Sequence, residues 1–197
     1  MSQTTLNIKE PGLNVLPPGV ERHVLNAGGL TGLQIYPDDE IEIINDEGNQ
    51  ICEITCFDKD GKSELGILGL KENNKSNLIK EILKNKDESS LITNYQLKKR
   101  NLDIEKSKSS IIFDKDAPSG EKIKFKSKDK CYSIFAAPNN KMLVSDQNPS
   151  GDLTIFIKRY KINNDKELSV IPDPVYNPKY EQNIDRQTCI SYQVKEG

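Results

Sequence analysis

The sequence contains a single histidine, His23, among its 197 residues. Sites that need two or more histidines, which include most catalytic zinc sites, are therefore excluded for this chain on its own. No apolar run approaches the ~18 residues that a membrane-spanning helix needs, so we expect no membrane partner. The first nine residues lack the apolar region of a secretory signal peptide. With only four cysteines in the chain, we expect reduced thiols and a cytoplasmic location.

An excess of charge of one sign is also missing. The 28 lysine and arginine residues nearly balance the 30 aspartate and glutamate residues, which leaves a net charge of −2. Nucleic-acid-binding proteins usually carry a basic excess, so we expect no nucleic-acid partner. Hydrophobic residues make up 35% of the chain, below the ~45–50% of an average globular domain, although that average also counts glycine. We expect a modest core, in one domain or in one domain plus the start of another.

Short apolar segments separated by turn residues recur along most of the chain, and several alternate between apolar and polar residues. They predict strands over residues 20–24, 33–36, 40–44, 50–57, 110–113, 122–125, 131–136, 142–144 and 153–160. The turn at 45–49 carries Gly48 where a left-handed conformation is favoured. The strands at 40–44 and 50–57 are therefore predicted to pair as a β-hairpin.

Two segments in the middle of the chain have the spacing of helices. The first follows Ser76, a candidate N-cap. Its apolar stripe consists of Leu78, Ile79, Ile82 and Leu83. The second spans residues 88–99 and is expected to end at a left-handed Asn101. Its apolar side consists of Leu91, Ile92, Tyr95 and the stem of Lys98. Many short strands around these helices predict a mainly β (α+β) fold, a β-sandwich or barrel-like domain with a short helical insertion.

The cysteines favour core positions over chemistry. Cys52 and Cys56 lie four residues apart on a predicted strand, so their Cα atoms would be ~13 Å apart on one face. That distance prevents a disulfide and makes a shared zinc ion difficult. With Ile54 on the same face, both are interpreted as small core residues. Cys131 and Cys189 are isolated in the sequence, and a nucleophilic cysteine needs a base or a positive neighbourhood.

The remaining polar motifs fit ordinary structural roles. His23 is interpreted as a surface or packed histidine. The glycines at 28, 29 and 32 lack the spacing of a phosphate-binding loop and are predicted to break the chain in a tight turn. The spacing of the acidic clusters at 38–40 and 114–116 matches no calcium-binding loop. The basic run at 98–100 is interpreted as a solvated helix end. We therefore predict no catalytic, cofactor-binding or metal-ligating residue, and favour a binding or scaffold module over a self-sufficient catalyst.

Several turn-and-strand motifs nevertheless resemble those of a known family. They are Leu-Pro-Pro-Gly-Val at 16–20, Asn-Ala-Gly-Gly at 26–29, Tyr-Pro-Asp-Asp-Glu-Ile-Glu-Ile at 36–43, Asp-Glu-Gly-Asn-Gln at 46–50, Phe-Asp at 57–58, Ala-Ala-Pro at 136–138 and Gln-Asn at 147–148. Together they resemble the urea-carboxylase-associated β domain. More specifically, residues 10–197 resemble the N-terminal module of large bacterial aminomethyltransferase-like proteins. In those proteins a second, related β domain follows, and then a folate-dependent domain of the glycine-cleavage T-protein kind.

Prolines predict an extended arm over residues 1–19 and a proline-rich linker over residues 163–187. The resemblance implies that residues 20–162 form the β domain, with its helical insertion at about 74–101. It also implies that residues 188–197 are the start of a second, truncated β domain. The chain would then be a fragment whose partners are downstream domains of the same polypeptide. Tetrahydrofolate is expected only in the downstream part, with no cofactor in this chain.

The resemblance also implies a function, with two alternatives. We expect a non-catalytic β domain of a folate-dependent, aminomethyltransferase-like enzyme of glycine or methylated-amine metabolism. The first alternative is a self-contained small-molecule binding domain associated with urea or amine metabolism, with a pocket lined by Phe57, Phe135 and Gln147. The second is a metal-dependent enzyme. Members of the β-domain family tend to carry a cysteine- and histidine-rich metal loop in the middle, whereas residues 71–115 contain neither cysteine nor histidine.

Overall fold

The computed structural model describes residues 16–17, 19–73, 78–139 and 151–160. Several of the expectations above lie outside these residues: Ser76, Gln147, Cys189, the strand at 142–144, the linker at 163–187 and the second domain start at 188–197.

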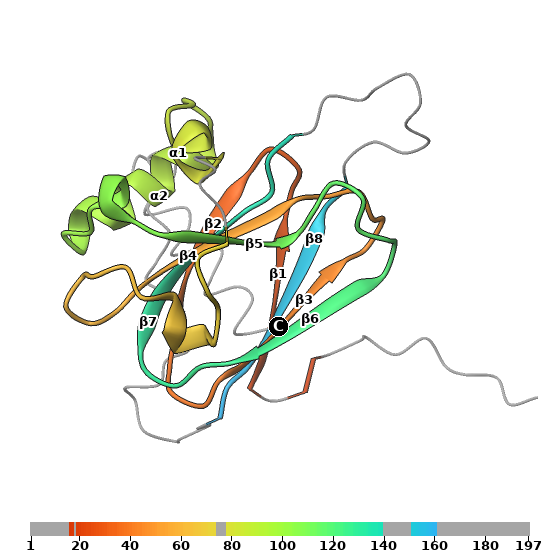
Figure 1. Ribbon diagram of the computed structural model, residues 1–197, viewed down its shortest axis with the longest axis horizontal. Helices are drawn as coiled ribbons and strands as arrows, with labels where there is room; N and C mark the ends of the chain where they lie inside the picture. The colour runs from red at the N-terminus through yellow and green to blue at the C-terminus, as the bar shows by residue number, and fades with distance from the viewer. Residues whose placement is uncertain (1–15, 18, 74–77, 140–150, 161–197) are drawn as a thin grey trace, which may run out of the picture.

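The strands of the described residues form two antiparallel sheets of four strands each (Figure 1). The first sheet has the order β1 (Val20–Leu25), β8 (Leu153–Lys158), β3 (Glu40–Asn45) and β6 (Glu121–Lys126). The second sheet has the order β2 (Leu30–Ile35), β7 (Cys131–Ala136), β4 (Cys52–Phe57) and β5 (Ser109–Phe113). This arrangement confirms the predicted mainly β, sandwich-like fold with a short helical insertion.

The main core lies between the two sheets. In the first sheet, β3 and β8 pair so that Ile41 lies opposite Ile157 and Ile43 lies opposite Ile155, and all four side chains are buried. Alternate residues of a strand point to opposite faces, so these isoleucines form one continuous inner surface. The side chains that the second sheet adds to this core include Leu33, Ile35, Cys52, Ile54, Cys56 and Phe135.

Two helices, α1 (Leu78–Leu83) and α2 (Glu88–Lys99), pack on the outer side of the second sheet (Figure 1). Two short 3₁₀ helices, η1 (Leu65–Leu68) and η2 (Ile104–Lys106), lie in the connections on either side of α1 and α2. The apolar contacts beneath the helices are made by Leu30, Phe57, Ile79, Ile82, Leu83, Leu97, Tyr132 and Ile134. Every residue of β4 and β7 is buried, because these central strands are covered on both faces.

The hairpin predicted for 40–44 and 50–57 is wrong. β3 pairs with β6 and β8 in the first sheet, whereas β4 pairs with β5 and β7 in the second. The intervening turn does form, with Gly48 (φ 81°) and Asn49 (φ 57°) both left-handed, but it carries the chain from one sheet to the other. Nδ2 of Asn45 donates to the Gln50 carbonyl oxygen at 2.9 Å across this turn. The six buried residues of β4 require cover on both faces, which only the helix-covered second sheet provides.

The predicted buried side of α2 is also wrong, although the helix spans residues 88–99 as expected. Leu91 and Tyr95 are 49% and 41% exposed. The side that faces the second sheet instead carries the buried polar residues Ser90, Thr93 and Gln96. The helix therefore turns polar side chains inward and two of its large apolar ones outward, which sequence periodicity does not predict.

Hydrogen bonds to the end of α1 explain this rotation. The Asp87 carboxylate caps α2 by accepting from the Ser90 backbone N–H at 2.9 Å. The Ser90 hydroxyl donates to the Ile82 carbonyl oxygen at 2.8 Å, and Nδ2 of Asn94 donates to the Leu83 carbonyl oxygen, also at 2.8 Å. These bonds satisfy the last carbonyl groups of α1, which have no partner within their own helix.

Candidate functional site

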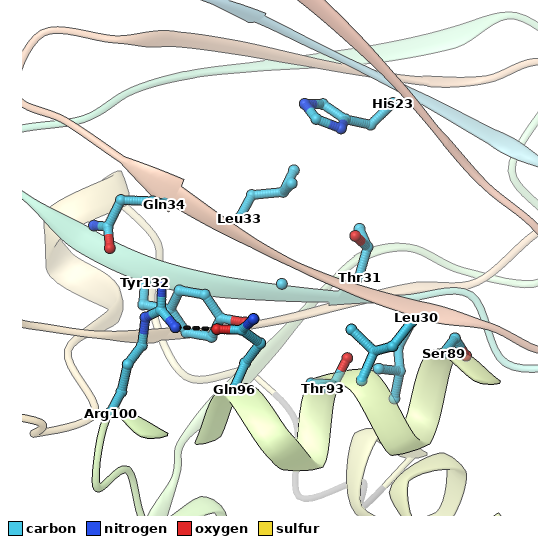
Figure 2. Close-up of a pocket in the computed structure, with 12 residues that line it drawn as sticks. His23, Leu30, Thr31, Leu33, Gln34, Ser89, Thr93, Gln96, Arg100 and Tyr132 are labelled. Carbon is cyan, nitrogen blue, oxygen red and sulfur yellow. Dashed lines mark hydrogen bonds between the residues drawn. The ribbon is translucent and has the colours of Figure 1, made fainter. Parts of the chain in front are cut away.

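A cavity of about 170 Å³ lies between α2 and β2 (Figure 2). We call it the α2–β2 cleft. Ser89, Thr93 and Gln96 line it from the helix, and Thr31 and Gln34 from the strand. Leu30 and Ile92 add apolar side chains, and Leu33, Arg100, Tyr132, Gly32 and His23 complete the lining. A small concave site with an apolar wall and a few polar groups is the usual form of a small-molecule site.

Tyr132 and Gly32 fit each other closely at the floor of the cleft. Gly32 lies inside β2, so the prediction that it breaks the chain is wrong. A Cβ atom at position 32 would lie 1.9 Å from the Tyr132 hydroxyl oxygen, far inside van der Waals contact. The glycine is therefore needed because the tyrosine ring of the neighbouring strand occupies the space that a side chain would fill.

Arg100 is held over that tyrosine ring. Its guanidinium carbon lies 4.4 Å from the ring centroid of Tyr132, and Nη1 donates to Oε1 of Gln96 (Figure 2). Lys98 and Lys99 are exposed, in keeping with the solvated helix end predicted for 98–100. Arg100 departs from that prediction, because the helix ends at it and directs it back onto the second sheet. A cation on an aromatic face is stabilised by the ring quadrupole.

A second cavity, of about 340 Å³, adjoins the first. The two share Gln34, Arg100 and Tyr132 in their linings. The second is bordered by charged side chains of both signs, namely Asp58, Lys59, Asp60 and Lys130. By contrast, the described residues that line the α2–β2 cleft include no aspartate and no glutamate.

Arg159 lies at the centre of a buried ionic cluster. Its Nε and Nη2 donate to the two carboxylate oxygens of Glu21 at 2.7 and 2.8 Å. Its Nη1 donates to Oδ2 of Asp39 at 2.6 Å and to the Gln34 carbonyl oxygen at 3.0 Å. Nε2 of His23 lies 3.2 Å from Oε2 of Glu21. The cluster thereby joins β1, β2, the start of β3 and the end of β8.

The charges in this cluster stabilise each other. Burial opposes the ionisation of Glu21, but hydrogen bonds from His23 and Arg159 and their charges outweigh it and lower the pKa of Glu21. Burial likewise opposes the charge of Arg159, but hydrogen bonds to Glu21 and Asp39 raise its pKa. A carboxylate that is fully paired and kept ionised is a poor general base, so we assign this cluster a structural role.

The cysteines occupy the core. Cys52 and Cys56 are buried on one face with Ile54, as expected, and Cys52, Cys56 and Cys131 are all free thiols. Sγ of Cys131 lies 3.5 Å from the hydroxyl of Ser133. Interaction with Cys131 and burial raise the pKa of Cys56, while interaction with Cys56, against burial, lowers the pKa of Cys131. Burial raises the pKa of Cys52.

Phe57 and Phe135, proposed for one pocket, are not brought together. Phe135 belongs to the core between the sheets, and Phe57 to the cluster beneath the helices, so they lie on opposite faces of the second sheet. Gln147 lies outside the described residues. Among the residues that the structure describes, no group of three or more histidine, cysteine, aspartate or glutamate side chains could hold a metal ion. No described helix is both long and apolar enough to cross a lipid bilayer.

No protein-family model matches this chain. It is 30% identical over 190 residues to a trimethylamine-oxide aldolase of Ruegeria pomeroyi, an alignment that covers 96% of this chain and 24% of that protein. The chain thus spans about a quarter of the length of the curated relative that it matches. A crystal structure of a DUF1989 family protein from Silicibacter pomeroyi superposes with a TM-score of 0.41 and 9% identity, covering 81% of this chain and 84% of the other. That structural likeness is too low to assign a fold or a function.

Proposed function

We propose that this chain is a non-catalytic β domain of a larger enzyme of methylated-amine metabolism. The observation that carries this proposal is the extent of the similarity to trimethylamine-oxide aldolase, which takes in nearly all of this chain but about a quarter of the relative. Trimethylamine oxide is an oxidised methylated amine. Most of the relative's length lies outside the alignment and is available to hold the site of its reaction.

The chemistry of the described residues supports a role without catalysis. The buried carboxylates Glu21 and Asp39 are neutralised by Arg159. Cys56 and Cys131 are enclosed in the core, with hydroxyl and thiol neighbours rather than a base. A catalytic residue must reach its substrate, and these groups are committed to holding the two sheets together. In this proposal the domain packs against and orients the part of the enzyme that carries the reaction.

The finer part of the proposal is that the larger enzyme is folate-dependent and aminomethyltransferase-like, with tetrahydrofolate bound outside this chain. It is supported by the turn-and-strand motifs at 16–58 and 136–148. The α2–β2 cleft, at about 170 Å³, is too small for a folate, which needs a pocket of roughly drug-ligand size, about 300 Å³ or more.

The test compares this chain with the gene product in its source cells. An antibody raised against the chain should detect a species far larger than 22.2 kDa. The purified chain should not consume trimethylamine oxide, with or without tetrahydrofolate, when the methyl proton signals are followed by NMR. The larger species, captured with the antibody, should consume it. A native species of 22.2 kDa, or steady turnover by the chain alone, would refute the proposal, and stoichiometric zinc in the purified chain would favour a metal-dependent enzyme.

A second candidate is a self-contained small-molecule binding domain. The observation that favours it is the α2–β2 cleft. Phe57 and Phe135 do not line this cleft, because they lie on opposite faces of the second sheet. A ligand that binds the folded chain raises its thermal stability by mass action. A thermal-shift screen with amines, urea derivatives and folates would support this candidate if one of them stabilised the chain in a saturable manner.

A further inference from the structure

We propose that the α2–β2 cleft is a binding site for a small aliphatic carboxylate. The inference does not depend on the proposed function, because it concerns only what the described residues of the cleft can bind. It rests on three observations: a threonine hydroxyl and a neighbouring amide that line the cleft, the charge of the lining, and the size of the cavity with its apolar wall.

The hydroxyl belongs to Thr93. This residue is 2% exposed and lies on the side of α2 that faces β2. Figure 2 shows its hydroxyl directed from the helix toward the strand, into the cleft. The hydroxyl is therefore placed to donate a hydrogen bond to an oxygen acceptor in the cleft.

Gln96 adds a second donor. Because its Oε1 accepts from Arg100, its Nε2 amide group points the other way, toward the Thr93 side of the cleft (Figure 2). The hydrogen-bond partner thus assigns the orientation of the amide. The inner surface of α2 therefore presents a hydroxyl and an amide N–H group one helical turn apart, both available to an oxygen acceptor.

The charge of the lining selects an anion. Arg100 is the permanently charged side chain of the cleft, and none of the described lining residues is acidic. A guanidinium presents planar N–H donors that match the two oxygens of a carboxylate. A methylated ammonium ion would find no carboxylate to balance its charge and would be repelled by Arg100. The cleft is thus suited to the opposite charge from that of a methylated amine.

The size and the apolar wall limit the rest of the ligand. At roughly 30 Å³ per water-sized group, a cavity of about 170 Å³ accommodates about half a dozen non-hydrogen atoms. Leu30 lies toward the Ser89 end of the cleft, away from Arg100 (Figure 2). A carboxylate on Arg100 with a short carbon chain against Leu30 would satisfy both ends. Inorganic phosphate would satisfy only the charged end.

The test measures binding of propionate and butyrate to the whole 197-residue chain by titration calorimetry, with sodium chloride at equal ionic strength as the blank. We expect one saturable site for each carboxylate and none for trimethylamine. Arg100→Gln should weaken binding at least about tenfold, the usual effect of losing a charged hydrogen bond. Arg22→Gln is the matched control, because Arg22 is an exposed arginine of β1 outside the cleft. It should bind as the unchanged protein does.

A second variant, Thr93→Val, tests the site even if the Arg100→Gln substitution disturbs folding. Valine has nearly the shape of threonine without the hydroxyl, so the variant should unfold no more easily than the unchanged protein. Its affinity for propionate should fall about fivefold. Absence of saturable carboxylate binding, equal affinity in the Arg100→Gln variant, or preferential binding of trimethylamine or phosphate would overturn the proposal.

Discussion

Arg159 and Glu21 form a two-bond contact in which Nε meets Oε1 at 2.7 Å and Nη2 meets Oε2 at 2.8 Å. Glu21 is near the start of the first sheet, and Arg159 follows its central strand β8. The contact therefore joins two parts of the chain that are 138 residues apart.

Arg159→Ala should be strongly destabilising. It would leave Asp39, which is buried, without its cation, and loss of one partner of a buried ion pair typically costs about 3–5 kcal/mol. Urea denaturation followed by circular dichroism measures the loss. The control is Lys158→Ala, which removes the exposed ion pair with Glu40 next along the chain, worth at most about 1 kcal/mol. Similar losses of unfolding free energy in the two variants would show that the buried cluster stabilises the protein no more than an exposed ion pair does.

Stability should fall with acid partly through Glu21. Its pKa is lowered in the folded state from an ordinary value of 4.5, so its contribution is fully present above pH 4.5 and is lost as the pH falls through the folded-state pKa. The difference in unfolding free energy between the unchanged protein and Glu21→Gln should therefore be largest above pH 5 and shrink below pH 4.5. Urea titrations from pH 3 to 7 measure it. A difference that does not change with pH would contradict this prediction.

Gly32→Ala should destabilise the second sheet, because the new methyl group would collide with the Tyr132 hydroxyl. Overpacking of this kind costs about 1–3 kcal/mol. Adding Tyr132→Phe should recover only part of the loss, since the ring carbon that bears the hydroxyl would still lie 2.5 Å from the new Cβ atom. A double-mutant cycle in urea denaturation separates this coupling from the effect of each change alone. If the effects of the two substitutions on the unfolding free energy simply added, the loss in Gly32→Ala would not come from a collision with Tyr132.

Truncations along α2 should follow the structure rather than the apolar pattern. Leu97 is buried, so Leu97→Ala should cost about 2–5 kcal/mol. Leu91 is on the exposed side, so Leu91→Ala should change the unfolding free energy by about 0.5 kcal/mol or less. The two variants remove the same atoms from the same helix, so each serves as the control for the other. The reverse order would mean that the helix is rotated from the orientation described above.

The three described cysteines should resist thiol reagents in the folded chain. Cys52, Cys56 and Cys131 are buried, and a thiolate must form and be reached before it reacts. Iodoacetamide labelling followed by peptide mass mapping should show these three modified only after denaturation. Cys131 is the sharpest case, because interaction with the neighbouring Cys56 thiol lowers its pKa. Rapid labelling of Cys131 in native buffer would show that the core opens there.

Local patterns predicted most of the elements. Alternation and turn chemistry act within a few residues, so the strand at 131–136 and the helix at 88–99 were placed at their observed bounds. Strand pairing was not predictable in the same way. β3 and β4 are separated by a turn that suits a hairpin, yet the turn connects two sheets. The strand with which another strand pairs depends on which elements pack against its two faces. For β4, one face is packed by helices that come later in the sequence.

The candidate cleft was missed for the same reason. Arg100 follows two exposed lysines in the sequence, and nothing local shows that it turns back onto Tyr132. Cys56 and Cys131 likewise lie on the paired strands β4 and β7, which are far apart in the sequence. One signal was available: Gly32 stands alone between Thr31 and Leu33 in an otherwise strand-like segment. An isolated glycine of this kind often marks the close approach of another group.

The position of β8 in the middle of the first sheet affects how the protein is made. β8 pairs with β1 on one side and β3 on the other, and among the described strands it leaves the ribosome last. Until Lys158 has emerged, β1 has no partner among the described strands, and β3 has only β6. The first sheet is therefore completed after, rather than during, synthesis of the described residues, and its dependence on distant pairings predicts slow folding. A nascent chain stalled before β8 would present the inner isoleucines of β3 to chaperones.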